Sequence, residues 1–231
     1  MPDDLSQFVN PTMDKGIDRM LDFQKVLESY EKKHKIILKR LSEYRKVWEL
    51  PEERIFAELA FCLCTPQSKA VVCDAAIKKL LENNLLFTGT AQQILPHLKE
   101  VRFNENKSRY IVEARKLFTE NGKISIKKHI DPKNILKTRE WIVENVKGIG
   151  WKEVNHFLRN IGFGDNIAIL DRHILKNLVK CGVIEAEPKS LTPKLYLEIE
   201  GKMKEFSELS GIPMSHLDLL FWGEETGYLF K

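Results

Sequence analysis

Hydrophobic residues along this chain recur mostly every three to four positions and rarely alternate with polar ones. That spacing places them on one face of an α-helix, whereas strict alternation is typical of a half-buried strand. The best strand-like segment, residues 123–126, is short. We therefore predict a mainly α protein. The sequence contains no internal repeat, low-complexity tract or long flexible linker.

Turn and capping signals divide this helical pattern into elements. Thr65 and Pro66 form a cap and first-turn pair, which predicts that a helix begins there. Asn83 and Asn84 end that helix, and Asn121–Gly122 predicts a turn. The predicted helices are two within the charge-rich stretch 13–49, then one at 55–64, one from Thr65–Pro66 through Ala70 to Leu81, one each at 91–100 and 105–119, and one that ends near residue 146.

Composition and charge narrow the class of protein. The 231 residues are 43% hydrophobic and 30% charged, which suits one large domain or two small lobes with a buried core. The net charge of +4 is compatible with a polyanionic partner but does not identify one. No apolar run approaches the roughly 20 residues of a membrane span, and residues 1–10 contain no signal-peptide core. We expect a cytoplasmic protein with no membrane partner.

The four cysteines do not form a recognisable metal-binding pattern. No C-x-x-C pair is present, and the spacing fits neither a zinc site nor the four-cysteine run of an iron–sulfur cluster. Each cysteine lies in or beside an apolar helical segment. We therefore expect buried free thiols, no iron–sulfur cluster and no catalytic metal. The cysteines are Cys62, Cys64, Cys73 and Cys181.

The clearest functional pattern is a predicted hairpin between two helices, with Val-Lys-Gly-Ile-Gly at residues 146–150. Gly148 and Gly150, on either side of Ile149, allow backbone conformations that other residues avoid. Backbone N–H groups at the start of the second helix form an anion site suited to a DNA phosphate, and Lys147 adds charge beside it. Taken alone, a Gly-Ile-Gly segment favours the simpler interpretation of a tight turn between helices.

Two further residues add chemistry to this hairpin. Lys152 lies in the opening turn of the second helix, where the positive end of the helix dipole disfavours an ammonium and favours the neutral amine. A neutral amine can attack carbon and form an imine. Asp171 follows an apolar run and opens another helix, so it is an N-cap candidate whose ionised carboxylate can also stabilise a cationic sugar. The simpler roles are a phosphate-contacting surface lysine and a capping aspartate.

In this order, the hairpin, Lys152 and Asp171 resemble the signature of the helix-hairpin-helix DNA glycosylase superfamily. The resemblance implies a two-lobed helical fold, with a core at residues 46–231 and an N-terminal helical extension at residues 1–45. It also implies a bifunctional glycosylase and abasic-site lyase. In that superfamily a lysine after the hairpin marks the bifunctional members, and a downstream aspartate completes the active site.

Features outside the hairpin resemble the archaeal type of 8-oxoguanine DNA glycosylase. Endonuclease III and the adenine glycosylases carry a four-cysteine cluster after this segment, whereas no cysteine follows Cys181 here. Alkyl-base glycosylases usually lack the lysine. The resemblance extends from about Ile55 to Lys231, and its most similar parts are residues 61–70, residues 102–111, Trp222 and residues 227–231.

The resemblance implies roles for five more residues. Gln67, Asn104 and Lys107 are expected to contact DNA, and Trp222 and Lys231 to recognise the flipped base. Each also has a simpler interpretation. Gln67 can be an exposed first-turn helix residue, and Asn104 and Lys107 can be loop and surface groups. Trp222 can be a core aromatic residue, and Lys231 a frayed terminus.

The expected partner is double-stranded DNA that contains oxidised guanine. The family further implies a monomer, nucleoid-associated in a prokaryotic cytoplasm. It allows an alkali cation on the hairpin carbonyls but requires no other cofactor. Two alternatives remain at this point: an endonuclease III-like or adenine glycosylase without its iron–sulfur cluster, and a non-catalytic helix-hairpin-helix DNA-binding protein.

Overall fold

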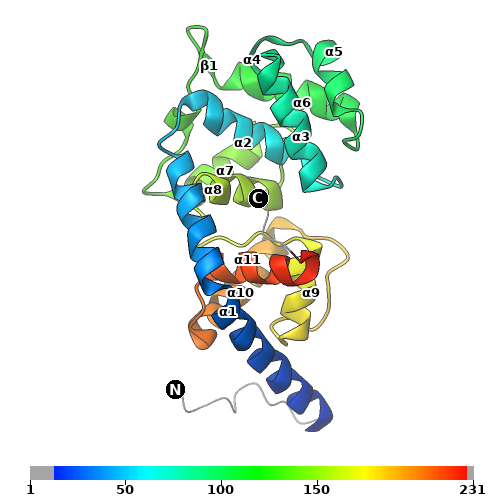
Figure 1. Cartoon of the computed structure of the whole chain (residues 1–231), viewed down its shortest axis with the longest axis vertical. Helices are drawn as coiled ribbons and strands as arrows, with labels where there is room; N and C mark the ends of the chain where they lie inside the picture. The colour runs from blue at the N-terminus through cyan, green and yellow to red at the C-terminus, as the bar shows by residue number, and fades with distance from the viewer. Residues whose placement is uncertain (1–12, 228–231) are drawn as a thin grey trace. The chain divides into compact units, whose positions relative to one another are not determined.

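The computed structural model describes the backbone of residues 13–227 and the side chains from residue 23 onward (Figure 1). Helices dominate, so the prediction of a mainly α fold is confirmed. The α-helices are α1 (Met13–Val47), α2 (Glu52–Cys64), α3 (Ala70–Glu82), α4 (Leu85–Thr88), α5 (Ala91–Ile94), α6 (Asn104–Leu117), α7 (Ile135–Asn145), α8 (Trp151–Asn160), α9 (Arg172–Lys180), α10 (Pro193–Ser210) and α11 (Met214–Thr226). Two 3-10 helices are η2 (Leu95–Leu98) and η3 (Ile126–His129).

A short antiparallel hairpin joins strands β1 (Thr119–Glu120) and β2 (Lys123–Ile124). The two residues between them, Asn121 and Gly122, have φ values of 49° and 75°. Positive φ at both central positions is typical of the two-residue turns that match strand twist. The predicted turn is therefore confirmed, and the strand-like segment predicted at 123–126 is a strand only at Lys123–Ile124, because Ile126 begins η3.

The described chain divides into two compact units, one built from residues 41–165 and one from residues 13–40 and 166–227. We call them the central unit and the terminal unit. The predicted boundary at residue 45 differs from this division, because residues 13–40 belong to the terminal unit. The prediction of two helices within residues 13–49 is wrong: α1 is continuous, and from Gly16 onward no glycine or proline interrupts it.

In the central unit, α2 is the core helix. Every residue from Ile55 to Cys64 is buried, and α3, α6 and α8 pack against this helix. Two buried polar groups meet within this core: Asn160 Nδ2 donates a hydrogen bond to Glu58 Oε2 at 3.1 Å. Pairing these groups avoids the large cost of an unsatisfied polar atom in an apolar interior. The prediction of a buried helix at 55–64 is confirmed.

Two predicted helix boundaries in the central unit are wrong. The helix expected from Thr65 begins at Ala70, because the Thr65 hydroxyl donates to Cys62 O at 2.9 Å and closes the end of α2 instead. The helix expected at 91–100 is α-helical only to Ile94 and continues as η2, in which Pro96 provides no backbone N–H donor.

In the terminal unit, α10 holds the segment that leads into α9. The Tyr196 hydroxyl donates to Ala168 O at 2.6 Å and accepts a hydrogen bond from Leu170 N at 3.1 Å. The Glu200 carboxylate accepts from Ala168 N at 2.8 Å. Because these groups are buried and bonded to backbone, the residues immediately before Asp171 are held in one extended path.

The end of α11 is tied to two other helices of the terminal unit by adjacent glutamates. Glu224 is bonded to Ser29 and Lys33 of α1. Glu225 is bonded to Lys176 at 2.6 Å and to Lys180 at 2.8 Å, both on α9. These contacts explain how the N-terminal helix, for which the sequence predicts no function, becomes part of this unit.

The two lysines hold the pKa of Glu225 well below its usual range, at about 2, mainly through the hydrogen bond from Lys176 and then that from Lys180. A carboxylate whose pKa is lowered by folding stabilises the folded state at pH values above its ordinary, unfolded-state pKa. This contribution is lost as the pH falls towards the folded-state pKa. We expect Glu225→Gln to lower Tm by roughly 2–4 °C at pH 7. The difference from wild type should disappear between about pH 4.5 and pH 2 in thermal unfolding.

Glu198→Gln is the matched control, because Glu198 forms an exposed pair with Lys202 at 3.0 Å within α10. Its effect on Tm should be smaller at every pH. Equal effects of the two substitutions would contradict a specific tie between α11 and α9.

Candidate functional site

The predicted hairpin is present, and α7 and α8 pack against each other on either side of it (Figure 1). Val146 ends α7, with its N–H donating to Ile142 O at 2.9 Å. Gly150 is the N-cap of α8, and its carbonyl accepts from Val154 N at 2.9 Å. The first backbone N–H groups of α8 have no acceptor within their own helix. Such N–H groups are suited to binding an anion, and the predicted contact with a DNA phosphate stays a prediction.

Position 148 is restricted to glycine for two independent reasons. Its φ of +86° lies in the left-handed region that L side chains rarely adopt. A β-carbon there would also lie 2.2 Å from Cδ2 of the Tyr110 ring on α6, far inside van der Waals contact. The hairpin therefore packs directly on an aromatic ring, and any side chain at position 148 would displace it.

The other hairpin residues differ in what they expose. The Lys147 side chain is 66% exposed, with its ammonium 5.7 Å from the centre of the Tyr110 ring and 3.7 Å from Glu113. This placement leaves the charge at the surface, where it can reach a phosphate. Ile149 is buried, so only its backbone is available to a ligand.

Lys152 lies in the first turn of α8 and is only partly exposed. Its side chain is 25% exposed, and Nζ is 3.6 Å from Oε1 of Glu153, whose own side chain is 15% exposed. The charge of Lys152 acts on nearby thiols: burial raises the pKa of Cys73 to about 11, while Lys107 and then Lys152 oppose that rise. The amine therefore lies partly within the central unit, accessible to solvent and beside the Glu153 carboxylate.

Glu153 is a site residue that the sequence analysis missed. Its second oxygen, Oε2, lies 3.2 Å from where a β-carbon of Gly150 would be, so the carboxylate folds back over the start of α8. The available signal was an acidic residue next to Lys152, but acidic residues are common in the first turn of any helix.

Asp171 caps α9, as predicted. Its Oδ1 accepts hydrogen bonds from His173 N at 2.8 Å and Ile174 N at 2.9 Å. Both bonds use Oδ1, so the cap does not require Oδ2. The capping bonds hold the side chain in one orientation, which leaves an oriented carboxylate oxygen for other chemistry.

Comparisons with known proteins agree on one family. The family described as 8-oxoguanine DNA glycosylase matches residues 37–212, which is more than half of the chain. The chain belongs to the 8-oxoguanine DNA glycosylase family. The sequence left open an endonuclease III-like enzyme, an adenine glycosylase and a non-catalytic DNA-binding protein. Membership of this family disfavours all three alternatives.

Individual members of the family are similar over nearly their whole length. The 8-oxoguanine DNA glycosylase/AP lyase of Fusobacterium nucleatum is 46% identical over 211 residues, which is 90% of this chain and 97% of that protein. The crystal structure of the Methanocaldococcus jannaschii 8-oxoguanine DNA glycosylase is 34% identical, with a TM-score of 0.79, and the match covers 92% of this chain and 97% of that one. A second M. jannaschii structure, in complex with a 15mer DNA containing 8-oxoguanine, is 32% identical, with a TM-score of 0.78 and coverages of 90% and 100%.

In this family member, Gln67 lies in the loop between α2 and α3. Its φ is 55° and its side chain is exposed, so the interpretation as a first-turn helix residue is wrong. Asn104 begins α6, where its Oδ1 accepts from Glu105 N at 2.9 Å. DNA contact by Gln67 and Asn104 stays a prediction.

Lys107 occupies a different environment from the one predicted. It is only 4% exposed, and its ammonium donates to Cys64 O and Pro66 O, each at 2.7 Å. A lysine that contacts phosphate must present its ammonium to solvent. The interpretation of Lys107 as a surface group is therefore wrong. Its ammonium lies beneath the loop of residues 65–69, which we call the Gln67 loop.

Phe103, immediately before α6, is a second residue that the sequence analysis missed. It has a φ of 58° and is 52% exposed. The only sequence signal was an aromatic residue at a helix entry, which more often indicates core packing. A large apolar side chain held outward in a strained conformation is a candidate for contact with a ligand.

The two residues predicted to recognise the base lie at the end of the chain. Trp222 is part of α11 and is half-buried. Lys231 lies outside the described residues.

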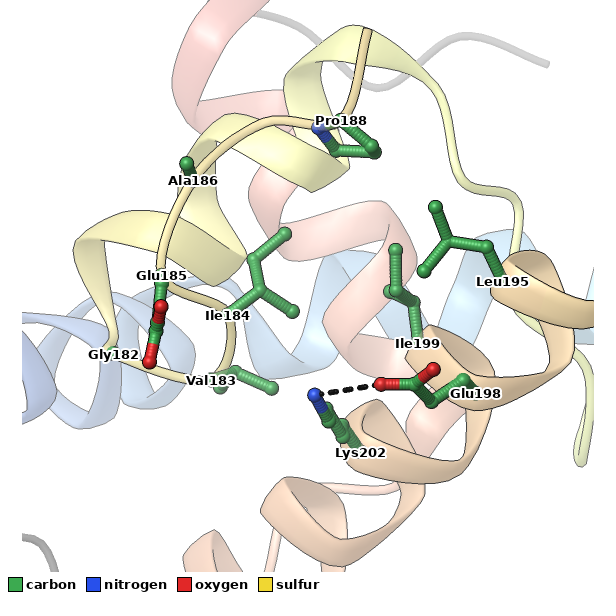
Figure 2. A pocket seen from close by; sticks show the side chains of 10 residues that line it. All are labelled: Gly182, Val183, Ile184, Glu185, Ala186, Pro188, Leu195, Glu198, Ile199 and Lys202. Atoms are coloured by element: carbon green, nitrogen blue, oxygen red, sulfur yellow. Dashed lines mark ion pairs between the residues drawn. The ribbon is translucent and has the colours of Figure 1, made fainter. Parts of the chain in front are cut away.

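A hollow of about 540 Å³ opens in the terminal unit between residues 182–188 and α10 (Figure 2). Its lining includes Glu198 and Lys202, which pair with each other, but none of the predicted site residues. The hollow therefore supplies neither of the predicted catalytic groups.

We expect Gly148→Ala to disrupt the hairpin, with Gly122→Ala as the matched control. Gly122 has a similar φ of +75° but no atom within 4 Å of an added β-carbon. The control should cost about 1–2 kcal/mol from backbone strain alone. Gly148→Ala should cost a further 1–3 kcal/mol or so, because the new carbon overpacks against Tyr110. Chemical denaturation measures both, and equal costs would contradict the steric part of this explanation.

Proposed function

We propose that this chain excises 8-oxoguanine from double-stranded DNA and then cleaves the strand at the abasic site, with Lys152 as nucleophile and Asp171 as the stabilising carboxylate. One observation supports this most directly. In a chain of this family, a partly exposed amine with a carboxylate beside it lies in the first turn of the helix that follows a glycine-containing hairpin. The relatives named 8-oxoguanine DNA glycosylase/AP lyase carry both activities in their names.

Binding precedes chemistry in this proposal. The N–H groups at the start of α8 and the exposed Lys147 hold the phosphate backbone. Gln67 fills the gap that the damaged nucleotide leaves in the base stack. Trp222 and Lys231 receive the flipped base, Trp222 through its aromatic face.

The excision step requires a nucleophile and charge stabilisation. The neutral amine of Lys152 attacks C1′ and forms a C–N bond, while the bond from C1′ to N9 breaks and its electron pair leaves with the base. The nitrogen then loses a proton, and the departing base gains one. Positive charge that develops on the sugar is stabilised by the ionised Asp171.

Strand cleavage follows from the covalent adduct. Opening of the sugar ring gives an iminium between Lys152 and C1′. A proton then leaves C2′, and the bond from C3′ to its phosphate oxygen breaks with departure of the phosphate. Glu153, with Oε1 3.6 Å from the same nitrogen, provides a negative charge next to the cationic iminium.

The remaining parts of the proposal concern cofactors and setting. These steps need no redox cofactor and no catalytic metal. Within the described part of the chain, no three His, Cys, Asp or Glu side chains are grouped so as to hold a metal ion. An alkali cation on the hairpin carbonyls stays a prediction.

The predicted setting is a monomer in a prokaryotic cytoplasm, associated with the nucleoid. No helix among the described residues is long and apolar enough to cross a bilayer.

The first test is borohydride trapping on a duplex with one 8-oxoguanine opposite cytosine. Wild type should give a covalent protein–DNA band, and Lys152→Gln should give none, because only a lysine imine is reduced to a stable amine. Lys147→Gln is the matched control: it should still trap, but with weaker binding at raised salt. A folded wild type that excises the base without trapping would overturn the lyase mechanism. A band from Lys152→Gln would assign the nucleophile elsewhere.

The second test separates the capping and catalytic roles of Asp171. Asn is also a good N-cap, so Asp171→Asn should preserve α9 and leave Tm nearly unchanged. Without the negative charge, single-turnover excision should fall by about 10²-fold or more. Asp171→Ala should lose both stability and activity. Retention of full activity by the Asn variant would show that the aspartate acts only as a cap.

A further inference from the structure

Beneath the Gln67 loop, Lys107 reaches up from α6 and places its ammonium among three acceptors. Nζ donates to Cys64 O and Pro66 O at 2.7 Å each and to Ser68 Oγ at 3.2 Å. A lysine ammonium has three N–H donors, so these bonds use its whole capacity. Because the residue is only 4% exposed, water cannot replace the acceptors without opening the loop.

The acceptors lie on both sides of a strained residue. Pro66 precedes Gln67 and Ser68 follows it, and Gln67 itself has a φ of 55°. A non-glycine residue in this region costs of the order of 1–2 kcal/mol, so the surrounding bonds must maintain it. Lys107 supplies those bonds from beneath, and the Gln67 side chain is left exposed.

The same network extends to a neighbouring loop. Ser68 Oγ, which accepts from Lys107, also accepts from Arg102 N at 2.9 Å. Next to Arg102, Phe103 is 52% exposed with a φ of 58°. The Lys107 ammonium therefore bonds directly to one loop and, through Ser68, is connected to a second one. Each loop has an exposed side chain on a residue with a positive φ, Gln67 in the first and Phe103 in the second.

We infer that Lys107 is a positioning residue that holds the Gln67 loop in the shape needed to enter duplex DNA. The inference rests on the proposed function, in which Gln67 fills the vacated space in the base stack. Lys107 does not touch DNA. It keeps the loop from relaxing to an unstrained conformation, so its contribution is greatest where a stacked duplex has to be opened and filled.

This role predicts a selective defect in Lys107→Met, a substitution of similar length without the charge. Single-turnover excision from an 8-oxoguanine duplex should fall by about ten-fold or more, as expected when buried acceptors lose their donor. Borohydride trapping on single-stranded abasic DNA should stay within about two-fold of wild type, because no stack has to be filled there. Lys116→Met on the same helix, where the lysine is exposed, controls for the lost charge and should change neither activity much.

A double-mutant cycle with Gln67→Ala tests whether Lys107 acts through the loop. If it does, the double variant should be little worse on duplex than the more impaired single variant. Fluorescence of 2-aminopurine beside the lesion should show reduced opening of the stack in both single variants. Equal losses on both DNAs, additive losses in the cycle, or unchanged duplex activity would each overturn the inference.

Ser68→Ala extends the test if Lys107→Met does not fold. It removes one acceptor of the ammonium and the link to Arg102 N but leaves both carbonyl contacts. We expect a smaller defect, again confined to duplex, and a defect shared by single-stranded DNA would refute the inference. Wild type distinguishes failure of the proposed function from failure of this inference. If wild type does not trap abasic DNA, the lyase mechanism is wrong. If wild type does trap it, the variants alone decide whether Lys107 positions the loop.

Discussion

The arrangement of the candidate site depends on the absence of a side chain at position 148. Gly148 combines a left-handed backbone with direct packing on the Tyr110 ring, so the turn between α7 and α8 can follow only this path. That path sets where α8 begins and where its N–H groups point. Lys152 is the second residue of the same helix, so the constraint on one glycine also fixes where its side chain leaves the helix relative to those N–H groups.

Asp171 shows how a stabilising and a chemical role can be one arrangement. Its Oδ1 closes the start of α9, and the segment before it is held by Tyr196 and Glu200. A carboxylate that accepts two backbone hydrogen bonds cannot rotate freely, so its second oxygen keeps a defined direction. Those properties make a good N-cap and also a good stabiliser of a nearby cation. The simple interpretation of the residue is therefore part of the functional one.

Features encoded within a few neighbouring residues could be predicted from sequence. The helical spacing of apolar residues, the hairpin glycines, the cap at Asp171 and the Asn121–Gly122 turn all belong to this class. Thr65 shows the limit of local signals, since a threonine hydroxyl can open a helix or close the preceding one, and here it bonds back to Cys62. Only the packing of the loop decides between these outcomes.

The environment of Lys107 could not be predicted in this way. Its acceptors, Cys64 and Pro66, are 43 and 41 residues distant in the sequence, and no local pattern connects them to a lysine on a polar helix. The division of α1 between two units has the same origin. Its pattern predicts a helix. The residues that contact each part of it, such as Glu224 with Lys33, are distant in sequence, so the division between units is not visible in a local pattern.

Lys107 and Lys152, one buried and one partly exposed in the central unit, differ in how their nitrogens are held. All three N–H groups of Lys107 donate to oxygens, and a protonated amine held in this manner has no lone pair to offer carbon. Lys152 keeps 25% of its side chain exposed, and the 3.6 Å between its nitrogen and Glu153 exceeds a normal hydrogen bond. The Lys152 nitrogen is therefore not held by close acceptors in the way that the Lys107 ammonium is. Burial alone does not make a lysine nucleophilic; what matters is whether the surrounding acceptors leave the nitrogen free to react.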